Sequence, residues 1–95
     1  MGNINEIWSL NKNQAKLLKT VVDNMKEKHI PVSGASGLAG PALGRAGSSL
    51  HQRNMIRPVG KENRQYKWTL TDEWKEIAKT DEKTLDDSLN EVLES

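Results

Sequence analysis

Residues 41–74, PALGRAGSSLHQRNMIRPVGKENRQYKWTLTDEW, constrain the fold most, because helix and strand signals alternate there over short distances. In the segment QYKWTL, polar and apolar residues alternate with the period of two that is typical of a half-buried strand. Residues 55–59 are the expected partner strand. Residues 60–63 are the expected turn, since Gly60 and Asn63 tolerate left-handed backbone geometry. Thr71 then predicts a helix N-cap, followed by Asp72 and Glu73, where the helix dipole favours anions. The stretch therefore predicts an antiparallel hairpin that leads directly into a helix.

An amphipathic helix is expected before this stretch, from about residue 13 to the segment before Pro31. Asn11 and Gln14 have the spacing of a capping box, and Leu10 and Ala15 that of a hydrophobic staple. Pro31 ends the helix because proline disfavours helical geometry at the preceding residue. The apolar residues at helical spacing are Ala15, Leu17, Leu18, Val21, Val22 and Met25. Lys12, Lys16 and Lys19 share the outer face. We interpret this mainly as a solvated face, with phosphate contact as the alternative.

Residues 30–40 leave two interpretations open, a short helix of small residues or a flexible loop. Gly34, Gly37 and Gly40 would each cost such a helix up to about 1 kcal/mol relative to alanine. A further helix is expected over residues 41–53, because proline is favoured at the first helical position. Its apolar stripe consists of Ala42, Leu43, Ala46 and Leu50. Its opposite side carries short or hydrogen-bonding side chains in place of the glutamate and lysine mixture of an ordinary solvated face.

The C-terminal segment, residues 80–95, is acidic and carries a regular apolar stripe. The stripe consists of Leu85, Leu89, Val92 and Leu93. This spacing predicts an amphipathic helix that must cover an apolar surface, on the core or on another copy of the protein.

Composition and charge narrow the classes of protein. Ninety-five residues make one domain with a modest core, and the absence of cysteine excludes disulfides and thiolate zinc sites. No apolar run approaches the roughly 20 residues of a membrane span, and no secretory signal is recognisable at the N-terminus. We expect a soluble, cytoplasmic or nucleoid-associated protein. Its net charge of +1 is uneven: residues 1–70 hold 11 Lys and Arg against 4 Asp and Glu, whereas residues 71–95 hold 3 against 9.

The order of these elements resembles the winged helix-turn-helix domain, especially the MarR-like and related small regulators. Two segments carry the resemblance, LHQRNMI at residues 50–56 and YKWTLTDE at residues 66–73. Asn54 stands where the family usually has glycine, which a left-handed conformation permits. The resemblance implies a mainly α fold with a small β-hairpin (α+β): a three-helix core, a wing and a C-terminal helix. Residues 41–53 would be the recognition helix and residues 60–64 the wing tip. The expected division is an N-terminal extension (1–12), a winged-helix domain (13–79) and an acidic amphipathic helix or tail (80–95).

These features lead us to expect a protein that binds double-stranded DNA, a small transcriptional regulator. The residues expected to contact DNA are Arg45, Ser48, Ser49, Gln52, Arg53, Arg57, Lys61, Arg64 and Lys67. The alternative is a winged-helix adaptor that binds protein, and residues 80–95 are also a candidate for homodimerisation. We expect no enzyme activity, no cofactor and no metal site. His29 and His51 form no zinc set without cysteine, and the glycine-rich run GASGLAGPALG lacks the ending of a phosphate loop.

Overall fold

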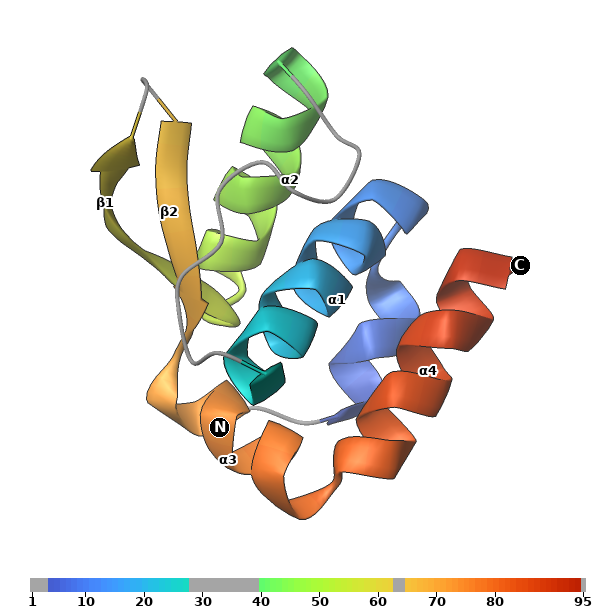
Figure 1. Ribbon diagram of the computed structural model, residues 1–95. Coiled ribbons are helices and arrows are strands. Elements are labelled where there is room, and N and C mark those ends of the chain that lie inside the picture. The colour runs from blue at the N-terminus through green and yellow to red at the C-terminus, as the bar shows by residue number, and fades with distance from the viewer. Residues whose placement is uncertain (1–3, 28–39, 63–64, 95) are drawn as a thin grey trace.

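The computed structural model describes residues 4–27, 40–62 and 65–94, which form helices and one hairpin (Figure 1). In chain order the elements are a 3-10 helix η1 (Ile4–Ser9), α1 (Lys12–Glu27), α2 (Gly40–Gln52), β1 (Ile56–Glu62), β2 (Gln65–Leu70), α3 (Asp72–Thr80) and α4 (Glu82–Glu94). The predicted class, mainly α with a small antiparallel hairpin, is confirmed. The predictions for residues 30–39, which include Pro31, and for Asn63 and Arg64 fall outside the described residues, whereas Gly40 is the first residue of α2. Within the described ranges, no helix is long and apolar enough to cross a membrane.

The predicted capping box closes the N-terminus of α1. The backbone N–H of Gln14 donates to Asn11 Oδ1 at 2.8 Å, and the backbone N–H of Asn11 donates to Gln14 Oε1 at 2.8 Å. These bonds satisfy donors that the start of a helix leaves without an intrahelical partner. The side-chain amide of Gln14 also donates to Ser49 Oγ, so the cap of α1 is bonded to α2.

The end of α2 depends on Asn54, whose φ of 62° lies in the left-handed region. Its N–H donates to the carbonyl of His51 at 3.0 Å, and the N–H of Met55 donates to the carbonyl of Leu50 at 3.1 Å. This pair of bonds forms a Schellman motif, which ends a helix and reverses the chain. Leu50 and Met55 are both fully buried in the core, as the motif favours. The expectation that Asn54 adopts a left-handed conformation is confirmed.

The hairpin is longer than predicted on its first strand. Its register pairs Ile56 with Leu70, Arg57 with Thr69, Pro58 with Trp68, Gly60 with Lys67, Lys61 with Tyr66 and Glu62 with Gln65. The prediction that β1 ends at Val59 and that the turn begins at Gly60 is wrong, because Gly60 to Glu62 are paired. Val59 is an extra residue that forms a β-bulge, and Gly60 has a φ of 156°, which side chains with a Cβ rarely adopt. The bulge breaks the alternation of β1, so the sequence pattern did not reveal its length.

Thr71 caps α3, as predicted, and also bonds the start of this helix to the end of α2. Thr71 Oγ1 accepts from the backbone N–H of Trp74 at 3.4 Å and donates to the carbonyl of Asn54 at 2.8 Å. The backbone N–H of Thr71 donates to the carbonyl of Met55 at 3.1 Å. The neighbouring Thr69, expected on the polar side of β2, is buried, so this end of the hairpin is covered on both faces.

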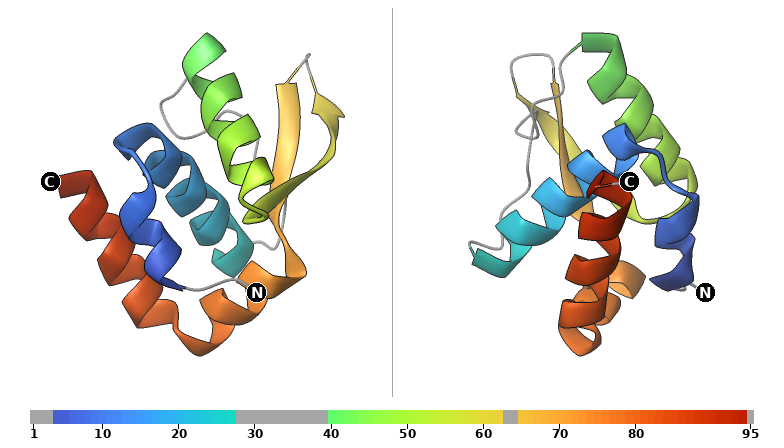
Figure 2. Two further views of the ribbon diagram at one scale, coloured as in Figure 1. Left: turned by 180° about the vertical axis from the view of Figure 1, so that it is seen from behind. Right: turned by 90° about the vertical axis from the view of Figure 1, so that its right-hand side faces the viewer.

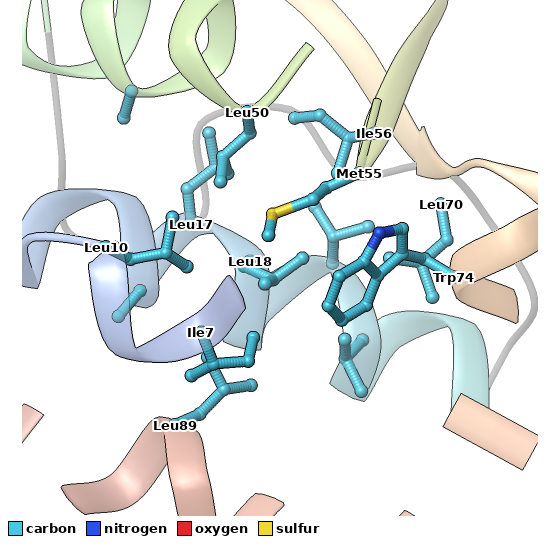
Figure 3. Packing of buried hydrophobic residues seen from close by; sticks show 14 of the residues in the cluster. Ile7, Leu10, Leu17, Leu18, Leu50, Met55, Ile56, Leu70, Trp74 and Leu89 are labelled. Atoms are coloured by element: carbon cyan, nitrogen blue, oxygen red, sulfur yellow. The ribbon is translucent and has the colours of Figure 1, made fainter. Parts of the chain in front are cut away.

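The core is built around α1 and includes both ends of the described chain. Leu17 and Leu18 of α1 are fully buried, and Figure 3 shows them between Leu50 above and Ile7 below. The segment η1, which supplies Ile7, lies beside α4 in both views of Figure 2. The α4 residues Leu85, Leu89 and Val92 complete the same cluster. The core therefore extends beyond residues 13–79 in both directions, and the apolar stripe of α4 is covered by the chain's own core.

Replacing a core residue of α4 tests whether this helix is an integral part of the fold. We expect Leu89→Ala to lower the free energy of unfolding by about 2–5 kcal/mol, because its side chain is fully buried. The control is Asn90→Ala at the adjacent exposed position, which should change stability by less than about 0.5 kcal/mol. Urea unfolding followed by circular dichroism measures both values. Equal stability of the two variants would show that α4 is only a loosely attached tail.

Candidate nucleic-acid interface

The surface of α2 is divided into three sides by its contacts. Successive residues of a helix are rotated by about 100°, so the neighbours on either side of Ser48 point in nearly opposite directions. Gly47 faces the hairpin, where it meets Trp68. Ser49 faces α1, where it accepts the hydrogen bond from Gln14. Figure 1 accordingly shows α2 between the hairpin and α1. The side centred on Ser48 is left open.

The open side of α2 carries three of the residues predicted to contact DNA. Arg45, Ser48 and Gln52 are exposed and lie at positions i, i+3 and i+7, which bring them onto one strip. Arg45 has no ion-pair or hydrogen-bond partner among the described residues. The whole of α2 contains no aspartate or glutamate. The strip therefore presents one cation and two hydrogen-bonding side chains on a helix that contains no acidic residue.

Two other residues of the predicted set lie beside this strip, not on it. Ser49 is half-buried and bonded to Gln14, and Arg53 Nη1 donates to Ser9 Oγ at 2.7 Å. Both contacts join α2 to the N-terminal part of the chain. The helical pattern did not separate these two residues from the strip, because it does not show which neighbour lies at each edge.

The hairpin is held against α2 by the indole of Trp68. A Cβ built on Gly47 would lie 2.6 Å from Trp68 Cζ2 and 2.9 Å from Cε2, so no residue larger than glycine fits without a shift. The ring of His51, one turn later on α2, has its centroid 6.1 Å from that of Trp68. By helix propensity alone, Gly47 is a weak point of α2, because glycine disfavours a helix interior. Its role in close packing depends on a contact 21 positions away in the sequence.

The β-bulge distributes the basic residues of the hairpin over both of its faces. Residues paired across two strands share a face, and residues two apart along a strand share a face. Lys61 pairs with the position two residues before Trp68, so it lies on the same face as Trp68, toward α2. Arg57 and Lys67 pair with residues of the opposite face. If Val59 were paired in regular alternation instead of forming a bulge, Lys61 would lie on the face of Arg57, because a shift of one residue reverses the face.

Exposure varies among these basic residues. Arg57 and Lys61 are exposed, whereas Lys67 is half-buried, and Arg64 lies outside the described residues. Lys19 Nζ of α1 forms an ion pair with Asp23 Oδ2 at 3.8 Å. Its charge is therefore partly neutralised within α1. Among the described residues, no three His, Cys, Asp or Glu side chains gather as a metal site would require.

Comparison with known proteins gives no match to a family model, to a curated protein or to a solved structure.

Two glycines of α2 form a matched pair that tests the packing of the hairpin. We expect Gly44→Ala to raise stability by about 0.5–1 kcal/mol, because nothing lies within 4 Å of the added Cβ and alanine favours the helix. We expect Gly47→Ala to lower stability by about 1–3 kcal/mol, because the added Cβ collides with Trp68. Urea unfolding gives both values, and near-ultraviolet circular dichroism reports any displacement of Trp68. Stabilisation by both substitutions would contradict the close contact.

Proposed function

We propose that this protein binds duplex DNA as a winged helix, with α2 as the recognition helix and the β1–β2 hairpin as the wing. The observation that carries the proposal is the open strip of Arg45, Ser48 and Gln52 on a helix without acidic residues. Arginine pairs with guanine and glutamine with adenine through two hydrogen bonds at the major-groove edge. An ordinary solvated helix face carries acidic and basic residues together, whereas this face carries arginine, serine and glutamine without acids.

The dimensions of α2 support this mode of binding. A helix with its side chains is about 10–12 Å across, and the major groove is about 12 Å wide. The strip from Arg45 to Gln52 spans seven residues, about 10 Å along the axis at about 1.5 Å per residue. At about 3.4 Å per base step, this length corresponds to about three base pairs. Gly44 and Ser48, both exposed and small, let the backbone of α2 approach the bases closely.

The arrangement of charge supports the same orientation. Lys61 lies on the hairpin face turned toward α2, and it is the wing residue best placed for the DNA strand that borders this groove. The acidic α4 lies across α1 from α2 and the hairpin (Figure 1), so its carboxylates are on the far side of the molecule. This separation allows a chain with a net charge of only +1 to approach a polyanion through its basic side.

The alternative function, a protein adaptor docking through residues 80–95, has less support. Leu85 and Leu89 are fully buried against the chain's own core, and Val92 is nearly so. A partner or a second copy would therefore meet only the charged outer face of α4, not the leucine stripe.

Selection of bound duplexes from a random pool, followed by titration of the enriched duplex, tests the proposal. We expect affinity to fall steeply with salt, because each neutralised phosphate releases condensed counterions. Arg45→Ala and Gln52→Ala should each cost about 1–3 kcal/mol of binding and relax the preference at one base position. Lys83→Ala, which removes an exposed lysine of α4, is the matched control and should leave affinity unchanged. The absence of an enriched motif together with a flat response to salt would exclude DNA recognition and favour the adaptor.

A further inference from the structure

The segment η1 holds a basic side chain on the side of α2 that is opposite to the hairpin. Arg53 Nη1 donates to Ser9 Oγ at 2.7 Å, and Ser9 Oγ in turn donates to the carbonyl of Glu6 at 2.8 Å. The bond to Glu6 fixes the hydroxyl of Ser9 within its own helix, and the same oxygen accepts the hydrogen bond from the guanidinium. Within the described part of the chain, Ser9 is the one side-chain partner of the Arg53 guanidinium, which has five N–H groups and so retains others for an anion. The acid of this segment, Glu6, has its Oε2 atom buried.

The residue before Ser9 is an exposed tryptophan. Trp8 is 53% exposed, whereas Trp68 and Trp74, the other two tryptophans, are 7% and 0% exposed. Ile7 next to it is fully buried and fixes η1 on the core, so Trp8 is presented by a rigid segment. The short segment η1 thus carries an exposed apolar ring at Trp8 and, at the next residue, the hydroxyl that binds a guanidinium. This is the chemistry that contacts a sugar–phosphate strand, where deoxyribose offers an apolar face and phosphate a negative charge.

The geometry of a groove makes the position of this pair significant. A helix that fills a groove about 12 Å wide has a sugar–phosphate wall on each side. The hairpin lies along one side of α2 through Trp68, and η1 lies along the other through Arg53. Each wall would therefore meet a different element of the protein.

We propose that η1 is a second backbone-contacting element, in which Arg53 and Trp8 hold the DNA strand opposite to the one held by the wing. The proposal rests on the proposed DNA binding of α2. Arg53 binds phosphate, Trp8 covers the adjoining deoxyribose, and Ser9 positions Arg53. The interface is consequently two-sided, and the N-terminal segment belongs to the DNA-binding surface as well as to the core.

The quenching of tryptophan fluorescence by acrylamide tests the contact directly, because Trp8 is the one tryptophan that is open to the quencher. We expect saturation with the enriched duplex to lower the Stern–Volmer constant of the full-length protein several-fold. In Trp8→Phe the constant should be low both with and without DNA, which assigns the signal to Trp8. Fluorescence anisotropy of labelled DNA in the same samples verifies that the complex forms. Binding by anisotropy without protection of Trp8 would overturn the role of η1 while the function of α2 stands, and the absence of any binding would overturn both.

Substitutions distinguish the role of each residue. Arg53→Ala should reduce the slope of log affinity against log salt by about 1, because one phosphate contact is lost. Trp8→Ala should lower affinity about fivefold or more with little change in that slope, since its contact is uncharged. Ser9→Ala should lower affinity less than Arg53→Ala, and Ser9→Thr, which keeps the hydroxyl, should restore it. Urea unfolding midpoints identify any variant whose fold is damaged. Wild-type affinity and salt slope in folded Trp8→Ala and Arg53→Ala would overturn the proposal.

Discussion

The arrangement of the hairpin depends on the hydrogen bonds that Thr71 makes with the carbonyls of Asn54 and Met55. Through them the end of α2, the start of β1, the end of β2 and the start of α3 meet at one point. One side chain satisfies a carbonyl at the end of one helix and an N–H at the start of another. Such groups are costly when buried without partners. The start of β1 and the end of β2 are therefore held at the same place, between α2 and α3. The turn end of the hairpin lies away from this junction.

The orientation of the hairpin follows from this junction together with the contact of Trp68 on Gly47. The junction holds one end of the hairpin, and the indole holds its middle against α2. Two separated attachments prevent the hairpin from rotating about either one. The β-bulge at Val59 then determines which basic residues are turned toward α2, and Lys61 is selected by this shift of register. The position of a cation relative to the proposed recognition helix is therefore set by one extra residue in a strand.

The N-terminal segment has a comparable double role. Ile7 and Leu10 are buried in the core, while Ser9 accepts a hydrogen bond from Arg53, the residue that follows α2. Gln14, in the first turn of α1, donates to Ser49 of α2 on the same side. Two polar contacts on one edge of α2 and an aromatic contact on the other leave a strip that is only about one third of its circumference. This division restricts the proposed reading of bases to Arg45, Ser48 and Gln52, and it assigns Ser49 and Arg53 to other tasks.

Much of the local structure could be predicted from the sequence, because it depends on residues within four or five positions of one another. The capping box of Asn11 and Gln14, the left-handed Asn54, the cap at Thr71 and the alternation along β2 are all of this kind, and the structure contains them. The exposed strip of α2 could also be predicted from the sequence, since helical spacing separates Arg45 and Gln52 from the apolar stripe. Tertiary structure alone decided that Gly47 is required by Trp68, that Ser49 is bonded to Gln14 and that Arg53 is bonded to Ser9. It also decided that Leu85 and Leu89 of α4 pack into the chain's own core. Each of these outcomes depends on the distance between segments far apart in the chain, and that distance is set by packing, which no local periodicity records.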